Sequence, residues 1–349
     1  MTLFATRFAS DGGTRLDGAV ETIHGSGGRA TTELVRTLFH RHFDNAYLAQ
    51  GNDQAAFDVE AAQVVMTTDA HVVSPLFFLG GHIGSLAVQG TINYVAMAGA
   101  RPLYLSAAFI LEEGFPLRDL ERIVASTARA SRDASVPVIT DDTKVVEKGK
   151  GDGVFITTTG VGIVPAGVNI GDRAKSGDAI LVSGTVGDHG VAVLSKRENL
   201  TFETGIVSDS AALHGLVAEM VAAVPALHCL RDPKRGGLAA TLNEIAQQSG
   251  AGMRLVESAI PVKVGALAAC ELLGLDPLYI ANQGKLVAIC EKADAGRLLD
   301  VMRRHPLGLD AALIGEVLAD PHAFISMKTR FGGSRMVDWL AGDPLPRIC

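Results

Sequence analysis

The last residue of the chain is a cysteine, Cys349, which follows the segment PLPRI. A thiolate is a good nucleophile, so a thiol can carry a substrate covalently. Pro344 and Pro346 favour an extended, stiff segment, and the last ten residues, 340–349, reach about 30 Å when stretched out. Because chain ends are usually poorly ordered, two interpretations stay open: a frayed end without a role, or a thiol that moves between solvent and a cleft.

Acidic residues of the first half follow apolar segments that are typical of strands. Asp69 follows VVMTT, Asp141 and Asp142 follow VPVIT, and Asp53 lies in the polar loop GNDQ. Mg²⁺ prefers hard oxygen ligands and usually takes one or two carboxylates, with water and nucleotide phosphate in the other positions. The pattern suits a Mg-ATP site, but acidic residues at solvated strand ends would give the same pattern without a metal. Lys144 lies two residues past Asp142 and can reach the same phosphate.

Three glycine-rich segments favour a nucleotide site between domains. HGSGG, residues 24–28, precedes a predicted helix and can present backbone N–H groups to an anion, although glycine clusters also occur in ordinary turns. GTVGDHG covers residues 184–190 and RDPKRGG covers residues 231–237. The polar residues that they offer to a ligand are Asp188 and His189 in the second segment, and Arg231, Asp232 and Arg235 in the third.

The elements that position these residues follow from apolar periodicity. Expected strands are 62–69, 103–111, 136–140, 153–164, 179–184, 286–290 and 323–327, and expected helices are 31–43, 117–131, 213–224, 238–250 and 295–305. Segment 165–178 begins with proline and is rich in glycine and charge, which indicates a linker. We therefore expect two α/β domains, each a sheet packed with helices: an extension 1–23, domains 24–165 and 166–330, and a mobile tail 331–349.

The composition limits the class of partner. The chain has 349 residues and a net charge of −7, from 31 basic and 38 acidic residues, so we expect no nucleic acid and no anionic membrane surface as partner. The four cysteines, at 229, 270, 290 and 349, form no CxxC pair, and the first three lie in apolar segments as core residues do. Without a signal peptide or a membrane-spanning apolar segment, the expected location is the reducing cytoplasm.

Together the motifs resemble the HypE family of hydrogenase maturation factors, or carbamoyl dehydratases, within the aminoimidazole ribonucleotide synthetase superfamily. The similarity extends over residues 24–349, and the terminal PRIC distinguishes this family from its relatives. The segments that carry it are HGSGG, PLFF, FILEEG, DTKVVEKG, SGTVGDHG, LRDPKRGG, PVK, CELLGLDPL, GKLVAI, HPLGLDAALIGEV and PLPRIC. The resemblance implies a two-domain α/β (α+β) fold of the aminoimidazole ribonucleotide synthetase type, and a homodimer.

The resemblance also implies a reaction. In the family, the partner HypF loads a carbamoyl group onto the terminal cysteine, and ATP with Mg²⁺ drives dehydration of this S-carboxamide to a thiocyanate. The cyanide then passes to iron held by HypC and HypD, for a NiFe hydrogenase. Phosphorylation turns the amide oxygen into a leaving group, and a base must take a proton from the nitrogen.

By this resemblance and the patterns above, we assign three sets of site residues. The catalytic set is Cys349, Lys144, Gln283 and His189; the metal set is Asp53, Asp69 and Asp142; the nucleotide set is His24, Gly25, Ser26, Gly27, Gly28, Asn93, Thr143, Lys144, Asp232 and Arg235.

Three positions depart from the family pattern. Tyr94 in NYVAMAGA replaces an Asp, His82 in GGHIG replaces an Asp or Asn, and Gln283 in ANQGKL replaces a Glu. An amide does not take up a proton as a carboxylate does, and tyrosine is a poor Mg²⁺ ligand. We expect all three changes near one site, with His24 or His189 as the alternative base.

Two other functions stay open. A catalytically impaired paralogue, which would only bind maturation partners or carry the thiol cargo, is suggested by Tyr94 and Gln283. A small-molecule ATP-dependent kinase or ligase of the same superfamily would have no use for PLPRIC.

Overall fold

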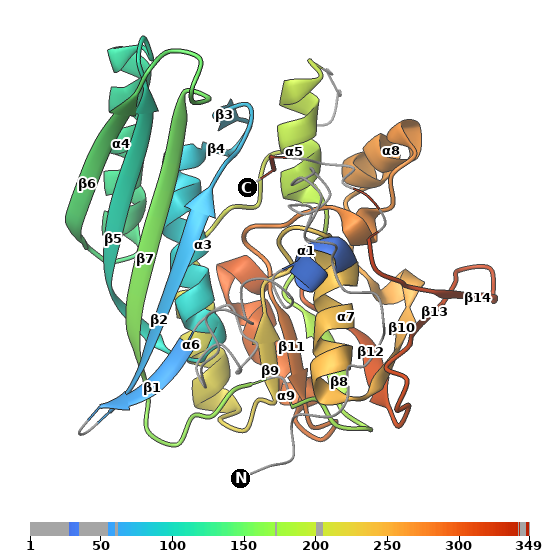
Figure 1. The fold of residues 1–349 in the computed structure, drawn as a ribbon. Helices are drawn as coiled ribbons and strands as arrows, with labels where there is room; N and C mark the ends of the chain where they lie inside the picture. Colours follow the sequence, from blue (N-terminus) through green and yellow to red (C-terminus); the bar gives the residue numbers. More distant parts are fainter. Residues whose placement is uncertain are drawn as a thin grey trace.

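The computed structural model describes residues 28–34, 55–59, 62–171, 173–199, 205–340, 342, 347 and 348. Outside the described residues lie Asp53, Cys349, the first four residues of HGSGG (His24, Gly25, Ser26 and Gly27) and residues 35–43 of the expected first helix. The rest forms two large sheets with their helices, together with a short two-stranded sheet (Figure 1).

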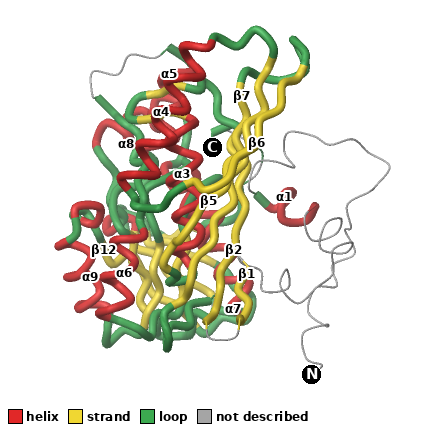
Figure 2. The backbone as a smooth tube through the Cα atoms, turned by 90° about the vertical axis from the view of Figure 1, so that its left-hand side faces the viewer, coloured by secondary structure: helices red, strands yellow, loops and turns green. Residues whose placement is uncertain are grey.

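The first sheet has five strands in the order β1-β2-β7-β5-β6, in which only β5 and β6 are parallel neighbours. Helices α3 and α4 lie on one side of it, as Figure 2 shows. The elements of this half are α1 (Arg29–Leu34), β1 (Ala55–Val59), β2 (Ala62–His71), β3 (Phe77–Phe78), β4 (Gly81–His82), α3 (Ile83–Met97), β5 (Arg101–Glu112), α4 (Leu117–Asp133), β6 (Val138–Val146) and β7 (Val154–Val164).

Close packing of α3 on β7 fixes the helix in the first half. Residues of β7 alternate between buried and half-buried, as expected for a sheet with one covered face. A Cβ atom on Gly160 would lie 2.9 Å from Thr91, and one on Gly162 would lie 2.4 Å from Val95. A larger side chain at either glycine would push α3 away from the sheet, so these glycines set where Tyr94 lies.

The second sheet has seven strands in the order β14-β13-β10-β12-β8-β11-β9. The central strands β8 and β11 are buried at every position, because α7 covers one face and α6 with α9 covers the other. The elements are β8 (Ala179–Val182), α5 (Asp188–Arg197), α6 (His214–Ala223), β9 (Cys229–Arg231), α7 (Gly237–Ser249), β10 (Gly252–Val256), α8 (Val264–Leu273), β11 (Val287–Cys290), α9 (Ala295–Arg304), β12 (Ala312–Leu318), β13 (Ile325–Lys328) and β14 (Ser334–Met336), with short 3₁₀ turns Glu257–Ala259, Pro277–Tyr279 and Pro306–Gly308.

A hydrophobic cluster joins the two halves. Val73 and Ile83 of the first half pack in one buried cluster with Val191 of α5, Ile280 and, from the C-terminus, Ile348. Burial of such side chains stabilises by roughly 1.5–3 kcal/mol each, so this cluster holds the two halves together.

The predicted α/β architecture of two sheets packed with helices is confirmed. Helix α3 was not predicted, because twelve of its fifteen residues are buried and a helix buried all round shows no amphipathic period. The expectation that Asp141 and Asp142 follow a strand is wrong, since both lie inside β6. β6 is an edge strand with mostly exposed side chains, so polar residues can continue it. Asp69 likewise lies inside β2.

The C-terminal segment returns to the protein interior. β14 pairs with β13, Val337 is 1% exposed, and Ile348 forms an antiparallel bridge with Val73. Among the described residues, no helix combines the length and the apolar character needed to cross a membrane.

Candidate active site

The penultimate residue of the chain is docked between the two halves. Ile348 is 1% exposed. The carbonyl oxygen of Arg347 accepts hydrogen bonds from the backbone N–H of Ser74 at 3.0 Å and from the guanidinium of Arg197 at 2.8 Å. Figure 1 shows this end of the chain between β2 and α5.

Two arginines, Arg197 and Arg347, hold the backbone beside Ile348. The Nε of Arg197 also donates to the carbonyl oxygen of Ser74 at 2.8 Å. One guanidinium therefore binds both backbone segments that meet at this contact, the one at Ser74 and the one at Arg347. Arg347 has a φ of +55°, a region that non-glycine residues rarely adopt, and its guanidinium pairs with Asp152. The docked position is therefore defined by specific contacts as well as by burial.

His189 holds the carbonyl group of Ile348. Its Nε2 lies 2.9 Å from that oxygen and its Nδ1 lies 2.8 Å from Oγ of Ser208. A carbonyl oxygen only accepts, so Nε2 carries the proton and donates. Ser208 Oγ itself accepts from the backbone N–H of Ser210, which leaves its hydroxyl proton for Nδ1. Burial lowers the pKa of His189, consistent with a neutral imidazole.

Gln283 points a polar group into this region without a partner. The residue is 1% exposed, and neither Oε1 nor Nε2 has a hydrogen-bond partner among the described residues. An unsatisfied buried polar group costs about 1–3 kcal/mol, so native proteins keep such groups where a ligand or water pairs with them. The Gln283 side chain is therefore a candidate ligand contact.

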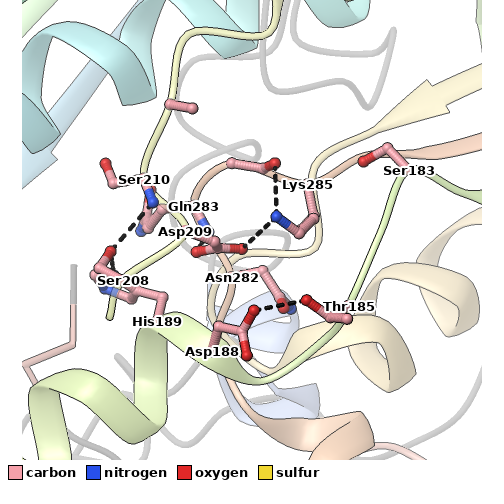
Figure 3. A network of polar contacts seen from close by, with 12 residues as sticks. Ser183, Thr185, Asp188, His189, Ser208, Asp209, Ser210, Asn282, Gln283 and Lys285 are labelled. Carbon is pink, nitrogen blue, oxygen red and sulfur yellow. Dashed lines mark hydrogen bonds and ion pairs between the residues drawn. The ribbon is translucent and has the colours of Figure 1, made fainter. Parts of the chain in front are cut away.

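The backbone around Gln283 is fixed by its neighbours. Its N–H donates to Asp209 at 3.1 Å, and Lys285 lies 3.5 Å from the same carboxylate (Figure 3). A Cβ atom on Gly284 would lie 1.8 Å from the carbonyl oxygen of Asp209. Only glycine fits at this position without moving the Asp209 loop.

Asn93, predicted to bind nucleotide, has its side-chain groups engaged within the protein. Its Nδ2 donates to the carbonyl oxygens of Ala211 and Gln283, each at 2.9 Å, and its Oδ1 accepts from the N–H of Leu213 at 2.7 Å. Asn93 thus joins α3 to the loops that carry Asp209 and Gln283. Its assignment to the nucleotide stays a prediction.

In the segment GTVGDHG, the buried carboxylate of Asp188 pairs with the half-exposed side chain of Lys263. Oδ2 of Asp188 accepts from the hydroxyl of Thr185 at 2.6 Å and lies 2.7 Å from Nζ of Lys263. The other oxygen, Oδ1, is buried without a hydrogen-bond partner in the described part of the chain. This carboxylate is therefore a second candidate ligand contact beside His189 (Figure 3).

Asp69 is bonded to cationic groups. Its Oδ2 lies 3.0 Å from Nζ of Lys234 and 3.2 Å from Nε2 of His71. Burial alone would raise the pKa of Asp69, but the His71 and Lys234 charges and hydrogen bonds outweigh it and hold the pKa well below its ordinary value. Asp69 is thus a carboxylate whose charge is already balanced.

Asp142 and Lys144 pair with each other on the exposed side of β6. Nζ of Lys144 lies 2.7 Å from Oδ1 of Asp142, and this bond, with the N–H of Thr143, lowers the pKa of Asp142. Three strand spacings, about 14 Å, separate β6 from β2, so one chain does not bring Asp142 beside Asp69.

The predicted metal set does not form a resident divalent site in the described residues. Asp69 is bonded to Lys234, Asp142 is bonded to Lys144, and no group of three or more His, Cys, Asp or Glu side chains with metal-binding geometry occurs in the described ranges. Mg²⁺ requires hard oxygen donors that are available to it. These residues therefore do not fit a protein-held ion at Asp69.

Three other predicted residues, Gly28, Asp232 and Arg235, lie among the described residues. A Cβ atom on Gly28 would lie 2.7 Å from the carbonyl oxygen of Leu340, so the end of HGSGG packs against the C-terminal segment. Asp232 is buried and Arg235 is half-buried in the loop between β9 and α7. Their roles stay predictions.

The three departures from the family pattern do not gather at one place. His82 precedes α3, twelve residues before Tyr94 in the sequence, which is about 18 Å along a helix. It packs against the ring of Phe77 with centroids 5.2 Å apart. Burial, then the charges of Arg122 and Arg129, lower its pKa. Gln283, by contrast, is bonded to Asn93, the neighbour of Tyr94.

The chain was compared with known proteins. It matches AIR synthase related protein, N-terminal domain, over residues 51–164, and AIR synthase related protein, C-terminal domain, over residues 175–328. The carbamoyl dehydratase HypE of Azotobacter vinelandii is 66% identical over 340 residues, which is 96% of this chain and 100% of that protein. The chain belongs to the carbamoyl dehydratase HypE family.

Solved HypE structures have the same fold. A crystal structure of HypE with ATP is 48% identical, with a TM-score of 0.79 over 93% of this chain and 98% of that one. A HypE–HypF complex is 46% identical, with a TM-score of 0.83 over 87% of this chain and 99% of that one. The family predicted from the sequence is thereby confirmed.

Lys234, His71 and Arg197 are not among the site residues predicted from the sequence. Lys234 lies in the quoted segment RDPKRGG, which was the only available signal for it. Its contact with Asp69 joins residues 165 positions apart, and periodicity in a single sequence carries no information about such pairs. His71 follows Asp69 by two residues, on the same face of β2, which was an available but weak signal.

Proposed function

We propose that this HypE family member is an ATP-dependent carbamoyl dehydratase that acts on an S-carboxamide of its own Cys349 and yields a thiocyanate. The cyanide so formed would serve the iron of a NiFe hydrogenase. The support is the identity of 66% to a carbamoyl dehydratase HypE over its whole length and the docking of residues 347 and 348 between the two halves.

The reaction balances without an oxidant or reductant. The amide oxygen attacks the γ-phosphorus of ATP, and ADP leaves; the C–O bond then breaks, and inorganic phosphate carries the amide oxygen away. Two protons leave the nitrogen as the C≡N bond forms. Phosphorylation is what makes that oxygen a leaving group.

The docked Ile348 is the single observation that carries this proposal. Cys349 is the next residue of the chain, and His189, Arg197 and Ser74 bind the backbone groups just before it. A substrate carried on a neighbouring thiol is then held at an effective concentration that no free substrate reaches. His189 is thus a positioning residue for the tail, and its Nδ1 can receive a proton through the Ser208 hydroxyl.

Gln283 is assigned to orient the carboxamide. An amide side chain can donate from Nε2 to the substrate oxygen and accept at Oε1 from the substrate nitrogen, and both of these atoms lack partners in the described structure. It does not act as a base, because an amide does not take up a proton.

The nucleotide is assigned to the glycine-rich loops, and the phosphate contacts predicted for Thr143 and Lys144 of β6 remain part of the proposal. Magnesium belongs in this proposal to the nucleotide substrate, as the Mg-ATP complex. A homodimer through the uncovered face of the first sheet remains part of the proposal, because exposed Tyr104 and Ile110 lie on β5 of that sheet.

HypF is the proposed carbamoyl donor partner, since a HypE–HypF complex has been solved for a relative 46% identical to this chain. HypC with HypD is the proposed cyanide acceptor. We also propose the cytoplasm as location, because Cys270 and Cys290 form no disulfide in the described part of the chain, as a reducing compartment favours.

The intact mass of the protein tests the proposal. With HypF, carbamoyl phosphate and ATP, the chain should gain one carboxamide and then lose one water, and Cys349→Ser should gain neither. A carboxamide that persists in the presence of ATP would contradict the dehydratase and would favour the paralogue that only carries the thiol cargo.

A further inference from the structure

Lys234 occupies a cage of oxygen atoms where the two halves of the chain meet. Its Nζ lies 3.0 Å from Oδ2 of Asp69, 3.3 Å from the carbonyl oxygen of Gly90 and 3.6 Å from Oδ2 of Asp232. The ring of Tyr94 covers the remaining side, with its centroid 3.3 Å from Nζ. Lys234 is 8% exposed, so the ammonium is removed from solvent.

This cage would suit a metal ion if the ammonium were absent. Two carboxylates and a backbone carbonyl are hard oxygen donors of the kind that Mg²⁺ and Mn²⁺ bind. With Lys234 in place, the same oxygens are used by a cation that is covalently part of the chain. The ring of Tyr94 adds a cation–π contact but offers no carboxylate.

Backbone packing keeps the cage small. A Cβ atom on Gly90 would lie 2.9 Å from Nε2 of His71, 3.2 Å from Nζ of Lys234 and 3.4 Å from Oδ2 of Asp69. The backbone of Gly90 therefore packs closely against the cage, and a second positive charge beside the ammonium would be repelled by it.

We propose that the Lys234 ammonium fills the cation position of Asp69 and Asp232, so that this chain has a built-in cation where a divalent ion would otherwise be held. Asp69 and Tyr94 come from the first half and Lys234 from the second, so the fixed cation also ties the halves together without any metal. This inference does not depend on the proposed reaction.

Binding of Mn²⁺ without nucleotide, counted by electron paramagnetic resonance, tests the inference on the full chain. The wild type and Asp69→Asn should bind the same number of ions. A wild type that binds one ion more than Asp69→Asn would overturn the inference, because Asp69 would then already hold a metal.

Substitution of Lys234, which removes the ammonium, is the second part of the Mn²⁺-binding test. Lys234→Met should gain one Mn²⁺ site with at least about tenfold higher affinity than any in the wild type, and the added Asp69→Asn change should remove it. Lys234→Arg keeps a cation and should gain none. Lys285→Met is the matched control, since Lys285 pairs with another buried carboxylate, Asp209, but has no comparable oxygen cage among the described residues.

A folded Lys234→Met protein without the extra site would overturn the inference. If that variant does not fold, the number of Mn²⁺ ions bound by the wild type and by Asp69→Asn tests the inference by itself.

Discussion

Nε2 of His189 lies 2.9 Å from the backbone carbonyl oxygen of Ile348, so a buried imidazole on α5 holds the end of the chain, whose last strand, β14, lies at the edge of the second sheet. The contact joins residues 159 positions apart. It explains how a segment that follows two prolines can have a defined docked position.

His189→Ala should loosen the docked tail. Loss of one buried hydrogen bond costs about 0.5–1.5 kcal/mol, which is about a 2- to 13-fold change in the docked population. Hydrogen exchange of the Ser74 amide, which donates to Arg347, should become faster by that factor. His322→Ala, which changes an exposed histidine, serves as control, and an unchanged Ser74 rate would contradict the role of His189.

The stability of the protein should fall in mild acid. Burial lowers the pKa of His189, His82 and His214, so these residues stay neutral in the folded protein while the unfolded chain protonates them below about pH 6.5. Unfolding then takes up protons, and stability is lost as the pH falls below that value. Each histidine contributes at most about 1.4 kcal/mol per pH unit.

Urea denaturation between about pH 7.5 and about pH 5.5 measures this slope. His189→Gln keeps a hydrogen-bond donor for Ile348 but cannot titrate, and it should reduce the slope by one proton. A slope identical to that of the wild type would show that His189 is not a neutral buried group.

Gln283→Leu should separate stability from activity. The change removes two buried polar atoms that lack partners in the described structure, so the free energy of unfolding should stay the same or rise by about 1 kcal/mol. Dehydration in a single turnover should slow by about 10- to 100-fold, because two hydrogen bonds to the carboxamide are lost.

The matched control is Asn282→Leu. Asn282 bonds to Gly187, Pro233 and Ile280, so its loss leaves buried backbone groups unpaired and should destabilise the protein by about 2–4 kcal/mol. If Gln283→Leu destabilises to a similar degree, or turns over at the wild-type rate, Gln283 is a structural residue.

Gly284→Ala should disturb the loop beside Gln283. Its Cβ atom would lie 1.8 Å from the carbonyl oxygen of Asp209, and the required backbone movement should cost about 2 kcal/mol or more in thermal or chemical unfolding. Gly296→Ala, where the added Cβ meets open space on α9, should be neutral or stabilise by up to about 1 kcal/mol. Equal stability of the two variants would contradict the close packing.

Residue patterns predicted four of the five strands of the first sheet, three of the seven strands of the second sheet and the family, but not the contacts that make the site. The strands without a predicted counterpart are β1 in the first sheet and β9, β10, β12 and β14 in the second. Helix α3 was not predicted, because it is buried on nearly every side and shows no amphipathic period. β6 was expected to stop before Asp141 because acids often end strands, yet an edge strand leaves its side chains in solvent and tolerates them. Lys234 was not predicted as a site residue, because its partner Asp69 lies in the other half of the chain.

The central claim is that a carboxamide on Cys349 loses its oxygen to ATP. An ¹⁸O-labelled carboxamide, loaded onto the full chain and followed for one turnover with ATP, measures the transfer directly. The account predicts one ¹⁸O atom in inorganic phosphate for each thiocyanate formed. Label that remains on the protein, or that appears in water while phosphate stays unlabelled, would contradict it.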